Sequence, residues 1–434
     1  MKKPRYGAYR KTKIIATLGP VTDKLETLEE MIKAGMNVAR INLSHGNFRE
    51  QARRVRLVRQ AAKNLNTHVA VMVDTKGVEI RTGSLGSDSV KLEVGNPFFL
   101  TATTMVGNAQ GVSISYGNLV SYVSKGDTIL LDDGAIELEV TETTGDKIQC
   151  VVKQGGLLGE RKGINLPRVK LATSTVDAEF IENLKQEIGF AVEQRVDYLA
   201  ASFIQSSSEI HKIRSLLLEQ DFPIPIIAKI ENNSGVNNAD SIAEVADGIM
   251  VARGDLGVEL PLAEVPGTQK KLIKTSVNKG KPAITATQML ASMETSLKPT
   301  RAEASDVANA ILDGTSAIML SGETAKGQYP IEVVEVMSTL AIRAEAYLDE
   351  FGLLQTVGMD ETFKITEAIG QASTRVARQL KAAAIIALTE SGFSARLISK
   401  HRPQSLILAV TCLLYTSPSP RDLSTDRMTS SALK

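Results

Sequence analysis

The sequence predicts an α/β protein built on a (β/α)8 TIM barrel with an inserted β-barrel lid and a further C-terminal α/β segment. Eight short runs rich in β-branched residues alternate with amphipathic stretches. Within uninterrupted stretches the runs start roughly 23 to 35 residues apart, which suits one strand and one crossover helix per unit. The runs cover residues 13–19, 36–44, 68–75, 196–204, 225–231, 248–255, 281–287 and 316–322.

Two of the intervening helices have recognisable ends. In the first, apolar residues recur at helical spacing from Leu25, with Asp23 as the expected N-cap and Gly35 as the expected C-terminal stop. The second is expected to begin after Pro299 and to end at Asp313.

The barrel pattern is interrupted between the third and fourth runs. Residues 76–172 carry short alternating segments, expected as strands at 90–94, 128–131, 136–141 and 147–152. This insert leaves the C-terminal end of a barrel strand, where barrel enzymes carry out their chemistry, so it is positioned to act as a lid.

The remaining segments complete the predicted domain organisation. The barrel is expected to comprise residues 1–75 and 173–350, and a partial α/β domain to span 351–411. In the latter we expect a helix at 365–380 and strands at 384–389 and 406–410, with Ile407 and Leu408 left uncovered because the domain is incomplete. Residues 412–434 lack periodicity and are expected to form an aberrant, disordered tail.

Composition excludes several classes of protein. The 434 residues include 50 Lys and Arg against 49 Asp and Glu, a balance that argues against a nucleic-acid or membrane-surface protein. No apolar run is long enough for a membrane span or a secretion signal, which predicts a cytoplasmic protein. With 2 cysteines and 4 scattered histidines, any metal is expected to be held by oxygen. The basic cluster between Arg53 and Lys63, which includes Arg54, is interpreted as a solvated helix face.

Polar residues alternate with apolar ones at the end of the second run. Arg40, Asn42 and Ser44 therefore share the strand face that points into the barrel mouth. The planar fork of an arginine suits a phosphate or a carboxylate, although a buried hydrogen-bonded layer is the alternative interpretation.

The third run ends in Asp74 and Thr75. Together with Asn42 and Ser44, these residues would form an oxygen-rich pocket suited to an alkali or alkaline-earth cation. Alternatively, Asp74 caps a turn at the lid boundary.

The fifth and sixth runs end in charged residues. Lys229 and Glu231 share a face, and Asp255 on the neighbouring strand is placed to bind a divalent ion together with Glu231. Two carboxylates without a nearby histidine match Mg²⁺, and a lysine beside the ion favours phosphoryl transfer. The alternative is a structural Lys–Glu ion pair.

Two threonine hydroxyls are expected on one face at the end of the seventh run, those of Thr285 and Thr287. Thr287 would then donate a proton or position a water, unless its hydroxyl is satisfied by the backbone.

Seven ordered motifs together resemble the pyruvate kinase family over about residues 11–411. They are MNVARINLSHG (36–46), DTKGVEIRTG (74–83), GINLP (163–167), AKIEN (228–232), MVARGDLG (250–257), ATQMLASM (286–293) and the stretch 299–330.

The resemblance implies transfer of the phosphoryl group of phosphoenolpyruvate to ADP, giving ATP and pyruvate, the final step of glycolysis. It implies that Lys229 stabilises the transferring group, that Glu231 and Asp255 hold Mg²⁺ or Mn²⁺, and that Arg40 contacts the phosphate. The amides of Gly254 and Asp255, with Thr287, would hold the substrate carboxylate.

The resemblance assigns the remaining roles as well. K⁺ would sit among Asn42, Ser44, Asp74 and Thr75. Arg81 and Lys162 would meet the nucleotide phosphates, and Glu79 goes with a K⁺ requirement.

The family is also implied to form a homotetramer, which the incomplete third domain argues against here. Two alternatives to an active kinase are an inactive truncated fragment and an enolpyruvate-handling barrel lyase without an ADP site.

Overall fold

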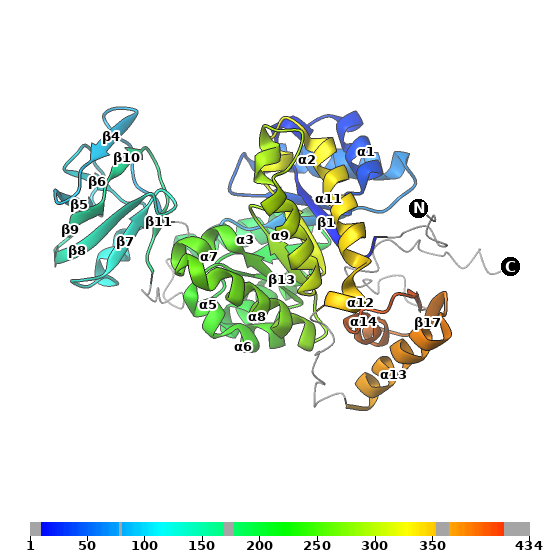
Figure 1. The fold of residues 1–434 in the computed structure, drawn as a ribbon. Coiled ribbons are helices and arrows are strands. Elements are labelled where there is room, and N and C mark those ends of the chain that lie inside the picture. The colour runs from blue at the N-terminus through cyan, green and yellow to red at the C-terminus, as the bar shows by residue number, and fades with distance from the viewer. Residues whose placement is uncertain (1–9, 78–79, 168–177, 353–363, 412–434) are drawn as a thin grey trace.

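The computed structural model describes residues 10–77, 80–167, 178–352 and 364–411. Eight parallel strands close into a barrel in the order β1-β16-β15-β14-β13-β12-β3-β2, so the predicted TIM barrel is confirmed (Figure 1). Its strands are β1 (Lys13–Thr17), β2 (Val38–Asn42), β3 (Ala70–Asp74), β12 (Tyr198–Ala201), β13 (Ile226–Ile230), β14 (Gly248–Ala252), β15 (Ala283–Ala286) and β16 (Ala317–Leu320). Each strand lies within the run that predicted it.

Helices surround the barrel on its outer side (Figure 1). The α-helices are α1 (Leu25–Ala34), α2 (Phe48–Asn64), α3 (Ala178–Glu193), α4 (Ser207–Leu218), α5 (Asn233–Asn237), α6 (Ala239–Val245), α7 (Arg253–Glu259), α8 (Val265–Asn278), α9 (Arg301–Leu312), α10 (Gly322–Ala325), α11 (Pro330–Glu345) and α12 (Leu348–Phe351). Short 3-10 turns are η1 (Pro20–Thr22), η2 (Gly117–Ser121), η4 (Leu262–Glu264) and η5 (Ala291–Glu294). Within the described part of the chain, none of the helices has the length and apolar character needed to cross a bilayer.

Alternation along each strand creates two separate apolar layers. On β13, Ile226, Ala228 and Ile230 pack in the layer between strands and helices, whereas Ile227 packs inside the barrel. Since successive side chains point to opposite faces, Lys229 shares the inner face with Ile227. An apolar layer therefore crosses the barrel interior, with charged side chains above it at the carboxyl ends of the strands. Lys13, which is fully buried, shares the inner face of β1 with Ile15 at the opposite end of the barrel.

The inserted segment folds around a core of its own. A six-stranded sheet has the order β11-β7-β8-β9-β5-β6, and a second sheet pairs β10 with β4. The strands are β4 (Ser89–Leu92), β5 (Pro97–Thr101), β6 (Gly111–Ser113), β7 (Thr128–Leu131), β8 (Ile136–Thr144), β9 (Lys147–Gln154), β10 (Gly156–Gly159) and β11 (Ile164–Asn165). Single bridges from Arg81 to Gly163 and from Thr82 to Ile114 link the two edges of the larger sheet, as expected for the predicted β-barrel lid.

The C-terminal described segment contains α13 (Lys364–Leu380), β17 (Ala384–Leu388), α14 (Phe393–Lys400) and β18 (Leu406–Val410). The two strands pair in parallel. The expectation that Ile407 is uncovered is wrong, because it is only 6% exposed and packs against Ala395 and Ile398. Leu408 is half-buried. Exposed apolar residues of this segment include Ile386 and Leu388 on β17, at 66% and 77%, Ile365 and Leu380 on α13, at 78% and 75%, and Val410 on β18, at 46%. The predicted tail, 412–434, lies outside the described residues.

The expectation that Asp23 caps helix α1 is also wrong. Lys24 is the N-cap residue and makes no side-chain cap, whereas Asp23 accepts hydrogen bonds from Arg54 Nε at 2.8 Å and Nη2 at 3.2 Å. Arg54 is 7% exposed, so the predicted solvated face of α2 contains one buried cation. A carboxylate near a helix start can serve either a backbone amide or a nearby guanidinium, and here the bidentate partner prevails.

Helix α9 begins after Pro299, as the sequence predicts, and its first turn carries a reciprocal cap that the sequence analysis did not identify. The Thr300 side chain accepts from the Glu303 amide at 3.2 Å, and a Glu303 carboxylate oxygen accepts from the Thr300 amide at 2.7 Å. Glu303 also accepts hydrogen bonds from the amide and hydroxyl of Ser292. The cap therefore fixes the loop after β15 to the start of α9.

Thr300→Ala removes one half of this cap and should destabilise the barrel by about 1 kcal/mol, because an amide of the first helical turn loses its acceptor. The thermal unfolding midpoint measures this loss. Thr339→Ala is the control, since Thr339 donates to a carbonyl within α11 and caps no helix. Equal midpoints for the two variants would contradict the role assigned to Thr300.

Candidate active site at the barrel mouth

The centre of the site is the carboxylate of Asp74 at the end of β3. It is fully buried and accepts from Arg40 Nε at 2.7 Å and from Lys229 Nζ at 2.9 Å. Burial raises the pKa of Asp74, but the charges of Arg40 and Lys229 outweigh this effect and hold the pKa below its ordinary value. Asp74 therefore stays ionised between two cations and does not cap a turn.

Lys229 joins three side chains at the mouth. Its Nζ lies 2.7 Å from Ser202 Oγ and 2.9 Å from Glu231 Oε1, in addition to its contact with Asp74. Burial lowers the pKa of Lys229, yet the carboxylates of Asp74 and Glu231 raise it above its usual value. The ammonium group therefore remains charged in an almost solvent-free position, with its orientation fixed.

Arg40 is held from two neighbouring strands. Its Nε donates to Asp74 on β3, and its Nη1 donates to Thr17 Oγ1 on β1 at 3.0 Å. The Arg40 side chain is 10% exposed. The guanidinium is thus oriented before any ligand arrives, as electrostatic catalysis requires.

Two further carboxylates lie near Lys229. Glu231 directly follows β13, and Asp255 lies in the first turn of α7, so the expectation that Asp255 belongs to a strand is wrong. Glu231 accepts a short hydrogen bond from the amide of Phe203, a residue that has left-handed backbone geometry with φ 55°. Burial first, and then repulsion by Glu231, raises the pKa of Asp255 to about 7. A pair of carboxylates that repel one another in a buried site matches the donor set that Mg²⁺ prefers.

The oxygen-rich quartet is divided between two strands and the turns that follow them. Asn42 and Asp74 are register partners on β2 and β3. Asn42 Oδ1 accepts from the Ser44 amide at 3.1 Å, and Thr75 Oγ1 accepts from the Ser202 amide at 3.1 Å. Ser44 is exposed, whereas Asp74 and Thr75 are buried. The described residues contain no cluster of three or more His, Cys, Asp or Glu side chains arranged for a metal, so oxygens of other kinds would have to contribute.

The expectation that Thr285 and Thr287 share a face is wrong. Thr285 is fully buried, and its Oγ1 lies 3.0 Å from Thr315 Oγ1. Ile284, the residue before it, lines the barrel interior, so Thr285 lies on the opposite, outer face of β15. Thr287 follows the end of the strand with φ 68°, so strand alternation no longer applies to it. Its hydroxyl accepts from the Gly254 amide at 2.7 Å and donates to the Ala286 carbonyl at 2.6 Å.

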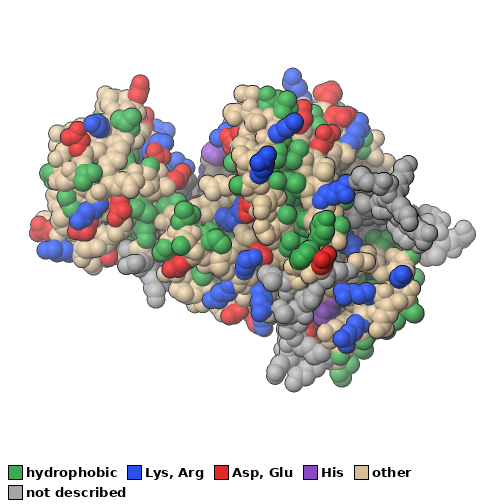
Figure 2. Space-filling model, viewed as in Figure 1, with side chains coloured by type: hydrophobic (Ala, Val, Ile, Leu, Met, Phe, Trp, Pro, Cys, Tyr) green, Lys and Arg blue, Asp and Glu red, His purple; other side chains and the backbone are tan. Residues whose placement is uncertain are grey.

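Arg81 and Lys162 lie together on the lid. The Thr82 amide donates to the Lys162 carbonyl at 2.8 Å, and Lys162 Nζ pairs with Asp132 at 2.9 Å. In Figure 1 the lid sheet extends to one side of the barrel. Basic and acidic side chains intermingle on the face shown in Figure 2, in agreement with the balanced composition. Glu79 lies outside the described residues.

Family models match most of the chain. A model for the barrel domain of pyruvate kinase matches residues 9–334, and one for the pyruvate kinase alpha/beta domain matches residues 367–429. The chain belongs to the pyruvate kinase family. Its function is that of a pyruvate kinase, as the ordered motifs predicted. The second match continues past Thr411 into the range expected to be an aberrant tail.

Individual relatives agree with the family models. Pyruvate kinases from Bacillus licheniformis and Geobacillus stearothermophilus are 48% and 44% identical to this chain. These matches cover 93% and 96% of this chain and 68% and 73% of the relatives. A crystal structure of a pyruvate kinase from Cryptosporidium parvum has a TM-score of 0.87 and 40% identity, covering 95% of this chain and 84% of that one.

Sequence reasoning missed two residues near the centre of the site. Ser202 hydrogen-bonds both Lys229 and Asp74, and its position at the end of the fourth run was the available signal. Glu187 on α3 is 4% exposed and accepts from the amide of Lys76 at 3.3 Å. Burial raises the pKa of Glu187 to about 7. A lone acid on an amphipathic helix gives no sequence signal of this kind.

Glu187 predicts a pH-dependent stability. Because its folded pKa is raised from 4.5 to about 7, its contribution is complete below pH 4.5 and is lost as the pH rises through 7. Glu187→Gln should therefore be more stable than the parent at pH 8, by on the order of a few kcal/mol, with the gain shrinking towards pH 5. Denaturant unfolding at a series of pH values measures the difference. Glu182→Gln, an exposed site on the same helix, is the control, and a pH-independent gain for Glu187→Gln would contradict the assignment.

Proposed function

We propose that this pyruvate kinase transfers the phosphoryl group of phosphoenolpyruvate to ADP and then protonates the enolpyruvate to give pyruvate. The observation that carries the proposal is the buried array in which Asp74 orients Arg40 and Lys229 at the barrel mouth. Two preoriented cations beside two acidic ligands suit a reaction that moves negative charge between phosphate oxygens.

We assign Arg40 to the substrate phosphate and Lys229 to the transferring phosphoryl group. Asp74 and Thr17 each accept one N–H of Arg40, and the remaining N–H groups of the fork are assigned to phosphate oxygens. Lys229 is charged and buried, so its field on the phosphoryl oxygens is screened weakly by water.

Glu231 and Asp255 are the proposed ligands of Mg²⁺ or Mn²⁺. A bound divalent ion would neutralise charge on the phosphoryl group and bridge it to the nucleotide. The pKa of Asp255 is raised by burial and then by repulsion from Glu231, and a bound cation would offset both effects, which supports this assignment. Asn42, Ser44, Asp74 and Thr75 are the proposed K⁺ ligands.

The carboxylate of the substrate is assigned to the amides of Gly254 and Asp255 and to Thr287. The link between the Gly254 amide and Thr287 Oγ1 supports a shared site for these groups. Thr287 is also assigned to proton delivery. Arg81 and Lys162 on the lid are assigned to the ADP and ATP phosphates. The cytoplasmic location stays a prediction, as does the expectation that this chain does not form the homotetramer of the family.

Lys229→Met should lower kcat for pyruvate formation by about 10²–10³-fold or more, because a preorganised cation at the reacting group is lost. The measurement is production of pyruvate and ATP from phosphoenolpyruvate and ADP. Lys33→Met, at an exposed lysine on α1, should retain full activity. Equal rates for Lys229→Met and the parent would refute the role of Lys229. Pyruvate formation that does not depend on ADP would favour the lyase alternative, and a folded parent without turnover would favour the inactive fragment.

A K⁺ requirement follows from the oxygen quartet. Replacing K⁺ by tetramethylammonium at equal ionic strength should abolish most activity, because the organic cation is too large to be ligated by the quartet. Ser44→Ala should raise the K⁺ concentration that gives half-maximal activity while leaving thermal stability unchanged, since Ser44 is exposed. Full activity in tetramethylammonium would eliminate the K⁺ assignment.

A further inference from the structure

Two consecutive residues after β15 have left-handed backbone conformation. Thr287 has φ 68° and Gln288 has φ 52°, and neither is glycine. This region is unfavourable for L-residues because Cβ crowds the backbone, and it is especially rare for a β-branched residue such as threonine. Such a pair persists only where surrounding contacts fix it.

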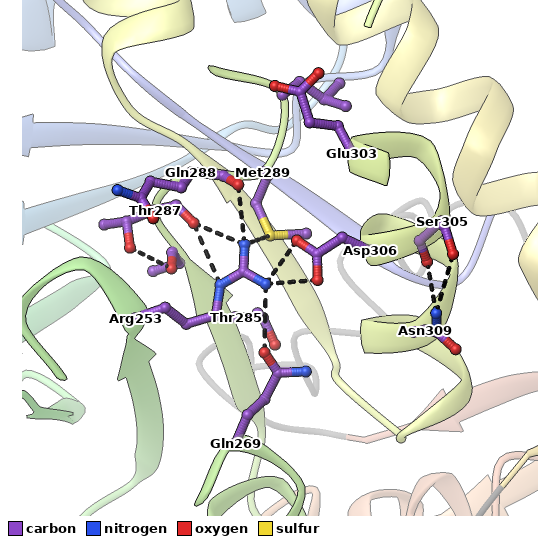
Figure 3. A network of polar contacts seen from close by, with 12 residues as sticks. Arg253, Gln269, Thr285, Thr287, Gln288, Met289, Glu303, Ser305, Asp306 and Asn309 are labelled. Atoms are coloured by element: carbon purple, nitrogen blue, oxygen red, sulfur yellow. Dashed lines mark hydrogen bonds and ion pairs between the residues drawn. The ribbon is translucent and has the colours of Figure 1, made fainter. Parts of the chain in front are cut away.

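The side chain of Arg253, the first residue of α7, supplies those contacts (Figure 3). Its Nη2 donates to the Thr287 carbonyl at 2.8 Å and to the Gln288 carbonyl at 3.1 Å, and its Nε lies 3.3 Å from the Thr287 carbonyl. The left-handed turn directs both carbonyls towards the same guanidinium. A single planar group thus satisfies two consecutive carbonyls that have left the barrel ladder.

Arg253 is itself anchored by helices outside the barrel mouth. Its Nη1 donates to both carboxylate oxygens of Asp306 on α9, at 2.7 and 2.6 Å. Gln269 Oε1 on α8 lies 3.4 Å from the same Nη1, and Gln269 Nε2 donates to Asp313 Oδ2 at 3.2 Å. The Arg253 side chain is 11% exposed and that of Asp306 is 36% exposed, so water reaches the carboxylate more than the guanidinium, which two charge-assisted bonds hold.

The backbone next to Arg253 makes a second link to the same residue. The Gly254 amide donates to Thr287 Oγ1 at 2.7 Å. The start of α7 therefore holds Thr287 at two points, its carbonyl through the Arg253 side chain and its hydroxyl through the Gly254 amide. If the carbonyl were released, the backbone could return to right-handed geometry and carry the hydroxyl away from Gly254.

We propose that Arg253, anchored by Asp306, is a positioning residue that locks the 287–288 turn in left-handed geometry and so fixes the Thr287 hydroxyl at the substrate carboxylate. The catalytic consequence rests on the proposed function, whereas the turn itself does not. Of the residues assigned to substrates, the lock positions only Thr287. It therefore affects kcat/KM for phosphoenolpyruvate and leaves KM for ADP unchanged.

Steady-state kinetics of Arg253→Lys and Asp306→Asn test the proposal. Lysine keeps the charge but cannot donate through a planar fork to Asp306 and both carbonyls at once. Both variants should lower kcat/KM for phosphoenolpyruvate by roughly 10–100-fold, the scale expected for misplacing one catalytic group, with KM for ADP unchanged. Arg54→Lys is the matched control, because the Arg54 side chain is 9% exposed, close to the value for Arg253. Arg54 also makes a bidentate pair, with Asp23, away from this turn.

A double-variant cycle separates positioning from general stability. Adding Arg253→Lys to Thr287→Ala should cause little further loss, because the group being positioned is already absent. Losses that multiply, or an Arg253→Lys variant whose activity matches that of Arg54→Lys, would overturn the proposal.

A crystal structure of Arg253→Lys gives a readout that does not depend on turnover. The lock predicts that φ of Thr287 and Gln288 becomes negative, and unchanged left-handed values would refute it. If Arg253→Lys does not fold, the structure of Asp306→Asn decides by the same criterion. A parent protein that forms no pyruvate while the variant turn rearranges would refute the proposed function but leave the lock intact.

Discussion

The charged site depends on one ionised carboxylate, that of Asp74. Arg40 and Lys229 are like charges that would repel one another at the barrel mouth, and Asp74 accepts a hydrogen bond from each. Removing it would leave two buried cations without their shared counter-charge, a much larger penalty than the loss of one surface ion pair. Burying the Asp74 carboxylate without partners would be unfavourable. Here Arg40 and Lys229 more than offset its desolvation, because the pKa of Asp74 stays below its ordinary value.

The barrel geometry explains why these groups meet. Arg40, Asp74 and Lys229 occupy inner-face positions near the carboxyl ends of three strands, above apolar residues such as Met72 and Ile227 on the same face. A closed barrel gathers such strand ends around one mouth, although the residues lie far apart in the sequence. The apolar layer below excludes water from the base of the site, and this strengthens the electrostatic interactions above it.

Periodicity made most of this site predictable. Strand alternation correctly placed Lys229 and Glu231 on one face, and their 2.9 Å contact follows from that placement. It failed at Thr287 because the backbone leaves the strand there and enters left-handed geometry, which no hydrophobic pattern encodes. The local N-cap preference failed at Asp23, because the side chain that Asp23 binds instead, Arg54, lies 31 residues away in the sequence. Residues such as Ser202 and Glu187 became apparent only through tertiary contacts, since neither carries a distinctive spacing.

The strand that carries Asp74 also begins the connection to the lid. After Asp74, the Thr75 amide donates to the Ala200 carbonyl at 3.0 Å, the Thr75 carbonyl accepts from Ser202, and the Lys76 amide is held by Glu187. Ser202 contacts Lys229 as well, so one hydroxyl joins the Lys229 ammonium to the first residues of the connection. Movement of the lid would therefore pull on a backbone segment anchored beside the charge centre. The anchors would resist this pull because they hold the start of the connection in place. Asp74 would then keep Arg40 and Lys229 oriented whatever the position of the lid.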